Sequence, residues 1–189
     1  MTVAFNSIIG GCWAVFILYW LISAAWTKVV AEKQSVWSGL AHRIPLRCSY
    51  VLLADLNLPP PMNSLITPHA DWAGAMGAST CVLGLVVTLW ARWTLGGNWS
   101  SAVTFKQGHE LIRTGPYRLV RHPIYTGLLV MALGTAFDFG QFRCWLALPL
   151  MTTAFWIKFK QEEKLLLRHF PQEYPLYKRQ VKALVPFVI

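Results

Sequence analysis

Residues 3–26 form a long stretch without a single charged side chain, and this stretch constrains the fold more than any other feature. About 20 consecutive apolar residues are enough to cross the hydrocarbon core of a bilayer as a helix. Backbone polar groups find no water in lipid, so a spanning segment must satisfy its hydrogen bonds internally. We therefore expect a helical membrane protein that begins with a spanning helix. The stretch has no positively charged leader before it, so we expect a retained helix and not a cleaved signal peptide.

Three more apolar segments predict further spanning helices. Residues 73–90 are the clearest, and residues 125–137 and 144–157 are shorter. Asp138, Phe139 and Gly140 separate the last two and predict a tight turn, so these two segments should form a helical hairpin near the C-terminal end.

The weakest candidate span is residues 46–58. It holds Arg47 and Asp55 near its ends, and three consecutive prolines from Pro59 onward should stop it firmly. A re-entrant or interfacial helix is an alternative for this segment.

The basic residues support five crossings. With five spans, only Arg143 among the seventeen Lys and Arg residues falls on the outer side. Membrane proteins concentrate Lys and Arg in cytoplasmic segments. This distribution predicts an N-terminus outside and a C-terminus in the cytoplasm.

Composition agrees with a multi-pass membrane protein. Charged residues make up 13% of the chain, whereas a soluble domain carries about 25%. The net charge of +9 is spread between apolar blocks, with no basic stripe and interleaved aromatics, so we expect the lipid bilayer as partner and no nucleic acid. The four cysteines are far apart and lack metal-ligand spacing, which predicts neither a disulfide framework nor a metal site.

The run 113–127 carries the strongest indication of a built site. It places Gly115, Pro116 and Pro123 among arginines, a histidine and tyrosines, between two apolar blocks. The prolines force extended or turn backbone before a helix that should start near Ile124, and a helix start offers unpaired N–H groups to an anion. Irregular backbone at membrane depth is tolerated where it lines a cavity. The alternative is that Arg118 and its neighbours simply bind lipid phosphates.

A second polar group follows the last predicted span. Lys158 and Glu162 are four residues apart, and Glu163 is adjacent. Residues at i and i+4 lie on one helix face. These groups could be a solvated helix face, but two carboxylates at the membrane boundary are also candidates to hold a cationic ligand.

These motifs together resemble a known family. The sequence His109-Glu-Leu-Ile112, the Gly115-Pro-Tyr117 turn, the Arg121-His-Pro-Ile-Tyr-Thr-Gly127 block and the downstream Glu162-Glu163 pair are similar to the isoprenylcysteine carboxyl methyltransferase family of integral-membrane enzymes. The resemblance covers about residues 95–189. It implies a single all-α, polytopic membrane domain over residues 1–189, with N-terminal helices in 1–70 and a catalytic half in 71–189.

The resemblance also implies S-adenosylmethionine (SAM) as cofactor. The positions that it assigns to cofactor binding are His109, Glu110, Leu111, Ile112, Tyr117, His122, Pro123, Ile124, Tyr125 and Glu162. Carboxylate and aromatic faces suit the sulfonium and ammonium cations of SAM. No glycine-rich GxGxxG motif is present, so a soluble-type Rossmann site is not expected.

The acceptor side departs from the family pattern. Lys158 takes the place of a family arginine that holds the carboxylate to be methylated, and lysine keeps the charge without the bidentate fork. We expect Glu162 to orient the cofactor and Lys158 or Arg121 to steer a lipophilic or prenylated acceptor, with carboxylate O-methylation favoured. The alternatives are methylation of a phospholipid or another small lipophile on N, O or S, an NADPH-dependent membrane reductase, and a non-enzymatic lipid-binding protein.

Overall fold

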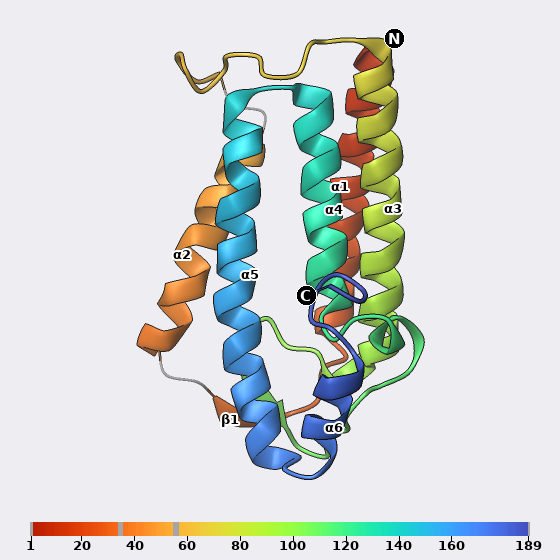
Figure 1. The fold of residues 1–189 in the computed structure, drawn as a ribbon, viewed down its shortest axis with the longest axis vertical. Helices are drawn as coiled ribbons and strands as arrows, with labels where there is room; N and C mark the ends of the chain where they lie inside the picture. The colour runs from red at the N-terminus through yellow and green to blue at the C-terminus, as the bar shows by residue number, and fades with distance from the viewer. Residues whose placement is uncertain (1, 34–35, 55–56, 189) are drawn as a thin grey trace.

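The computed structural model describes residues 2–33, 36–54 and 57–188. Most of them are helical, and the long helices run side by side (Figure 1). The helices are α1 (Thr2–Ala24), α2 (Val36–Leu53), α3 (Asp71–Leu95), α4 (Pro123–Phe139), α5 (Phe142–His169) and α6 (Glu173–Gln180). The shorter elements are the strands β1 (Val30–Lys33) and β2 (Thr104–Lys106) and the 3₁₀ turns η1 (Gly96–Asn98) and η2 (Gly115–Arg118).

Helices α3 and α4 pack through glycines. A Cβ added to Gly84 would lie 2.6 Å from the carbonyl oxygen of Gly127, and one added to Gly134 would lie 2.5 Å from the carbonyl oxygen of Gly77. Small residues of this kind let two membrane helices bring their backbones together. The contact fixes α4 and therefore the position of the residues at its start.

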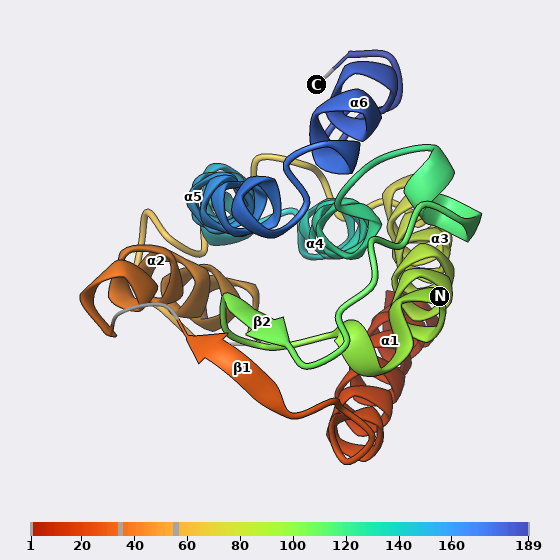
Figure 2. The same cartoon turned by 90° about the horizontal axis from the view of Figure 1, so that it is seen from below.

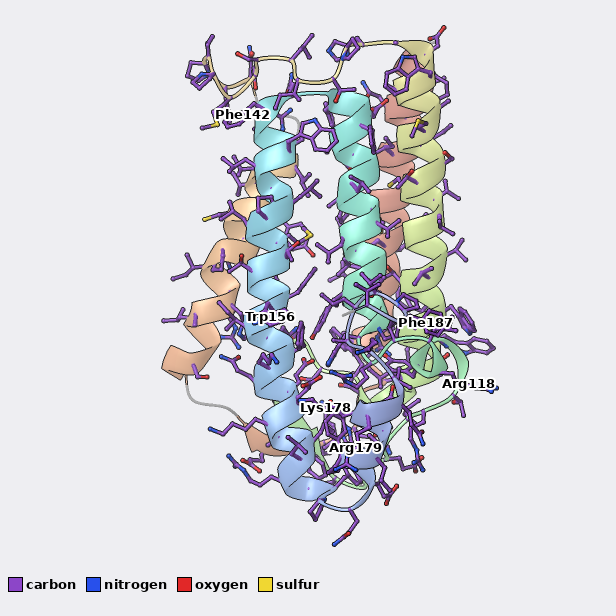
Figure 3. All side chains as sticks on the ribbon, in the orientation of Figure 1. Arg118, Phe142, Trp156, Lys178, Arg179 and Phe187 are labelled. Atoms are coloured by element: carbon purple, nitrogen blue, oxygen red, sulfur yellow. The ribbon has the colours of Figure 1, made fainter. Side chains whose placement is uncertain are left out.

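Helix α5 is one continuous helix that extends well beyond the predicted span of residues 144–157. It begins at Phe142 at the upper end and continues to His169 at the lower end, where α6 carries Lys178 and Arg179 (Figure 3). Its lower half is joined to α2, because the side-chain amide of Gln161 donates to the carbonyl of Ser38 at 3.0 Å and its Oε1 contacts His42 Nδ1 at 3.0 Å. This continuity puts Lys158 and Glu162 on a rigid element.

The outer surface of the helices is apolar. Leu18 and Leu21 of α1 and Leu83 and Val86 of α3 are all exposed. Two described helices are long and apolar enough to span a membrane, over Ala4–Ala24 and Asp71–Asn98, and the apolar helix Pro123–Phe139 is shorter. A soluble monomer rarely exposes such continuous apolar surface.

The structure differs from the sequence expectation in two places. Helix α2 covers Val36–Leu53 where the sequence indicated 46–58, so it begins a full ten residues earlier and includes Pro45; residues 55 and 56 of the predicted range lie outside the described residues. In addition, β1 and β2 form a small antiparallel pair at the lower end, between α2 and α1 in the view from below (Figure 2). A chain predicted to be all-helical gave no indication of these strands, because each is only three or four residues long and pairs with a distant segment.

Candidate active site

A polar cavity of about 130 Å³ lies at the lower end of the helices. Its walls come from the end of α3, the segment that carries β2, the turn before α4, and α5. Its polar lining includes Asn98, Thr104, His109, His122, Tyr125 and Glu162.

Four polar atoms of this lining are buried without a hydrogen-bond partner among the described residues. One is His122 Nε2, which lies 3.5 Å from the Glu163 carboxylate, and the other three are Asn98 Oδ1, Thr104 Oγ1 and His109 Nδ1. Buried polar atoms in native proteins are almost always hydrogen-bonded, and an orphan calls for an explanation. Three orphans around one cavity indicate that a polar ligand satisfies them.

Tyr125 and Glu162 form the centre of the site. The Tyr125 hydroxyl donates to Glu162 Oε1 at 2.6 Å. The Tyr125 ring stacks on Phe155 with centroids 4.6 Å apart, and the His122 ring stacks on Tyr125 at 5.6 Å. His122 Nδ1 lies 3.6 Å from Glu162 Oε2. Aromatic faces and a carboxylate therefore meet at one point, which suits a cationic ligand.

A second, apolar cavity of about 850 Å³ lies on the other side of Tyr125. It is walled by α1, α2, α4 and α5, and most of its lining is aromatic or aliphatic. Lys158 is its one cationic side chain among the described residues. Lys158 is only 8% exposed, and its Nζ lies 5.3 Å from the centroid of the Tyr125 ring.

The two cavities meet at Trp99, Ile124 and Tyr125, which line both. Lys158 and Glu162 are one helical turn apart on α5, and each lines a different cavity. The ring of Tyr125 faces the ammonium of Lys158, while its hydroxyl binds the carboxylate of Glu162. The site thus offers an anion-binding group on the apolar side and a cation-binding group on the polar side.

Glu163 is the centre of a buried ion cluster next to the site. Its Oε1 accepts hydrogen bonds from Arg121 Nε at 2.9 Å and Nη2 at 2.5 Å, and its Oε2 accepts from Lys178 Nζ at 2.8 Å. His122 Nε2 lies 3.5 Å from the same carboxylate. Burial alone would raise the pKa of Glu163, but His122, Lys178 and Arg121 together hold that pKa well below its usual range. Glu163 therefore stays ionised and joins α5 to α6 and to the start of α4.

The C-terminal segment closes over this cluster. The backbone N–H groups of Arg121 and His122 donate to the carbonyls of Lys182 and Ala183 at 2.8 and 3.0 Å. Arg121 Nη1 also donates to the carbonyl of Val181. Arg121 is thus fully engaged within the protein, and it lines the polar cavity, not the apolar one.

His109 lies in an aromatic cluster at the entrance of the polar cavity. Its ring stacks on Phe105 at 4.8 Å, and Phe105 stacks on His169 at 3.6 Å. Burial, with the nearby charge of Lys28 as the next cause, lowers the pKa of His109 to about 4. The imidazole is therefore neutral at physiological pH and offers both a donor and an acceptor.

Six of the ten sequence-predicted cofactor residues line the polar cavity; these are His109, Tyr117, His122, Ile124, Tyr125 and Glu162. Glu110 is exposed, and Leu111 and Ile112 are half-buried away from the cavity lining. Pro123 is buried as the first residue of α4, where its fixed φ favours the helix start.

The sequence did not indicate Asn98, Trp99, Thr104 or Phe105 as site residues, although they line the polar cavity. It also did not indicate that α1 and α2 wall the apolar one. The only local signal was the glycine pair before Asn98. Gly96 has a φ of +54°, which glycine adopts freely, and it ends α3 so that Trp99 turns inward.

Fold and site together define a helical membrane protein in which a polar and an apolar binding cavity meet at one aromatic wall. The model of the isoprenylcysteine carboxyl methyltransferase (ICMT) family matches residues 76–168. The chain is 32% identical over 162 residues to a probable protein-S-isoprenylcysteine O-methyltransferase of Oryza sativa subsp. indica, an alignment that covers 79% of this chain and 78% of the rice protein. The chain belongs to the ICMT family and is an integral membrane protein.

Two further comparisons agree. A protein-S-isoprenylcysteine O-methyltransferase of Tribolium castaneum is 33% identical over 123 residues, which cover 62% of this chain and 43% of the beetle protein. A solved structure of the eukaryotic intramembrane Ras methyltransferase ICMT superposes with a TM-score of 0.56 at 31% identity, over 78% of this chain and 52% of that one. The chain thus spans about half the length of these two relatives.

Proposed function

We propose that this protein transfers a methyl group from SAM to the carboxylate of a prenylated cysteine or a closely similar lipophilic acid. The observation that carries the proposal is the meeting of the two cavities at Tyr125, with Glu162 on the polar side and Lys158 on the apolar side. A methyltransferase for a lipid-linked acid needs one cavity for a water-soluble donor and another for a chain taken from the bilayer.

The polar cavity supplies the groups that SAM requires. Glu162 and the Tyr125 and His122 rings suit its cationic end, and the orphaned atoms of Asn98, Thr104 and His109 suit its other polar groups. At about 130 Å³ the cavity is smaller than the ~300 Å³ at which ligand pockets usually begin. We propose that the wall from Trp99 to Phe105, which lies outside the long helices, moves outward when the donor binds.

The apolar cavity supplies the groups that the acceptor requires. Lys158 is buried and donates no hydrogen bond to a described residue, and a buried ammonium in apolar surroundings costs free energy unless an anion pairs with it. The acceptor carboxylate fills that role, with its apolar chain between α1 and α2. Lysine binds it as a point charge, where the usual arginine of the family would bind in a bidentate manner.

The chemistry then depends on positioning. When bound, SAM supplies an electrophilic methyl group on a sulfonium sulfur. A carboxylate is already deprotonated at neutral pH, so no residue of the site has to remove a proton. Lys158 holds the carboxylate, Glu162 and Tyr125 fix the donor side, and Trp99 and Phe155 exclude water. Alignment of two bound reactants lowers the barrier by about 7 to 11 kcal/mol in the best cases. Arg121 acts as a positioning residue through Glu163.

The membrane topology belongs to the same proposal. Helices α1 to α5 cross the bilayer five times, and α4 and α5 form a helical hairpin joined at Gly140, which has a φ of +65°. The segments at the lower end carry β1, β2, η2 and α6 together with most of the basic residues (Figures 1 and 2). That end faces the cytoplasm, and the N-terminus lies outside.

The product of the reaction tests the proposal. Purified protein in nanodiscs is incubated with methyl-labelled SAM and N-acetyl-S-farnesyl-cysteine, and the lipid extract is treated with mild alkali. We expect labelled product that releases volatile methanol, because a methyl ester is alkali-labile whereas N- and S-methyl groups are not. Absence of label, or label that resists alkali, would refute carboxylate methylation. Incubation of the same protein with NADPH instead of SAM should yield no reduced product. Membership of the ICMT family favours neither the reductase nor the lipid-binding alternative.

A further inference from the structure

Gly10 lies in the middle of α1 and lines the apolar cavity. A glycine inside a helix is destabilising by about 1 kcal/mol relative to alanine. The usual compensation is the close approach of another backbone, as at Gly84. At Gly10 a Cβ would meet no atom of the described residues within 4 Å. The packing of the protein itself therefore gives no reason for a glycine at this position.

What distinguishes Gly10 from Gly11, where a Cβ also meets nothing within 4 Å, is that Gly10 lines the apolar cavity. Helix α1 faces it with a stripe of residues three or four positions apart, consisting of Asn6, Ile9, Gly10, Trp13, Phe16, Ile17 and Trp20. This spacing is the period of one helix face. All the other members of the stripe carry medium or large side chains, so Gly10 is the one place on it where the wall is set back. Gly11, the next residue, is off the stripe and does not line the cavity.

Lys158 gives an independent indication that this cavity holds a ligand, because its ammonium is buried there against the Tyr125 ring and forms no ion pair with a described carboxylate. Lys158, Trp20 and Trp99 lie toward the junction with the polar cavity. Gly10 lies about 15 Å further along the axis of α1 than Trp20, at 1.5 Å of rise per residue. An acceptor with its carboxylate at Lys158 therefore reaches Gly10 only with the far part of its apolar chain.

We propose that Gly10 is a specificity-determining residue that leaves room for the distal part of the acceptor's lipid chain and so sets the longest chain that the protein accepts. This inference rests on the proposed function, and it concerns a helix that lies outside the residues matched by the family model. Acceptors too short to pass Gly10 do not depend on it.

Chain-length selectivity of two matched variants tests the proposal. Gly10→Leu fills the recess in the cavity wall. Gly11→Leu is the control, because it makes the same change at the next residue of α1, where a Cβ also meets nothing within 4 Å but which does not line the cavity. The substrates are the N-acetyl-S-geranyl, S-farnesyl and S-geranylgeranyl cysteines. An overfilled site costs about 1 to 3 kcal/mol, so Gly10→Leu should lower the ratio of kcat/KM for geranylgeranyl to that for geranyl by about tenfold or more. Gly11→Leu should leave the ratio unchanged.

An unchanged ratio in Gly10→Leu, or an equal change in both variants, would overturn the proposal. Binding of the same three compounds, followed by quenching of tryptophan fluorescence, gives the corresponding ratio of Kd values without any methyl transfer. Failure of the proposed reaction would therefore appear as a loss of turnover with all compounds in the wild type, while the chain-length ratio stays measurable by binding. A Kd ratio that Gly10→Leu does not alter overturns the inference in that case as well.

Discussion

Replacing Lys158 by methionine should make the protein more stable and less active at once. Lys158 is 8% exposed in an apolar cavity, and its Nζ lies 5.3 Å from the centroid of the Tyr125 ring. Methionine has a similar length and no charge. Removing a buried ion that lacks a hydrogen-bonded partner should raise the free energy of unfolding by about 1 to 4 kcal/mol.

The same substitution removes the group that binds the acceptor carboxylate. A hydrogen bond to a charged group contributes about 1.5 to 3 kcal/mol, which corresponds to a decrease in kcat/KM for the acceptor of about ten- to 150-fold. The KM for SAM should stay near its wild-type value, because Lys158 does not line the polar cavity.

Two measurements and one control decide this prediction. Thermal unfolding in detergent should give a Tm at least about 2 °C higher than that of the wild type, since 1 kcal/mol shifts the Tm of a chain of this size by about 2 to 4 °C. Lys164→Met is the matched control, because Lys164 is exposed on the same helix and lines neither cavity, so the substitution should change neither quantity. A Lys158→Met protein that is less stable, or that keeps the acceptor kcat/KM of the wild type, would refute the reasoning.

Three further predictions concern the donor side and the fold. Glu162→Gln should weaken SAM binding in calorimetry by about tenfold or more, because a charge-assisted contact is lost. Glu110→Gln, which changes an exposed carboxylate, should leave the affinity for SAM unchanged. Equal affinities of the Glu162→Gln variant and the wild type for SAM would exclude the role of Glu162. Below pH 6.5 the unfolded chain protonates His109, whereas the folded protein, in which the pKa of His109 is about 4, does not, so the free energy of unfolding should fall between pH 6.5 and 4. His109→Gln should flatten that part of the stability profile. A variant profile that runs parallel to the wild-type profile would contradict the burial argument. Gly84→Ala should cost about 1 to 3 kcal/mol of stability, measured as a lower Tm, because its Cβ would lie 2.6 Å from the α4 backbone. Gly11→Ala, where a Cβ meets nothing within 4 Å, should instead gain up to about 1 kcal/mol from the higher helix propensity of alanine. A Gly84→Ala variant as stable as Gly11→Ala would contradict the close packing of α3 on α4.

The sequence predicted the elements of this protein well where one local signal dominates. The uncharged residues 3–26 correspond to α1, and Gly140 ends α4 at the position where the sequence predicted a turn. The prediction failed at α2, where 46–58 was expected and Val36–Leu53 is found. Its first half carries His42 and Arg43 just before Pro45, a residue that usually ends a helix, and no local pattern reveals that this half packs against α5.

The residues of the candidate site also divide into those that a local sequence motif reveals and those that it does not. Tyr125 and Glu162 could be named from sequence because they belong to a motif, and the hydrogen bond between them is consistent with that assignment. Asn98 and Thr104 have no motif, and they line the cavity only because the segment after α3 folds back over it. The wall of the apolar cavity comes largely from helices that carry no family motif, so the proposed role of Gly10 follows only from the shape of the cavity. That residues 1–189 act as a single domain stays a prediction.

The central claim is that donor and acceptor occupy separate cavities that meet at Tyr125. A cryo-electron microscopy structure of the protein in nanodiscs with S-adenosylhomocysteine and N-acetyl-S-farnesyl-cysteine would test it most directly. We expect the homocysteine sulfur on the Glu162 side of the Tyr125 ring, the acceptor carboxylate at Lys158, and the farnesyl chain between α1 and α2. Both molecules on the same side of Tyr125, or an acceptor carboxylate away from Lys158, would contradict the account.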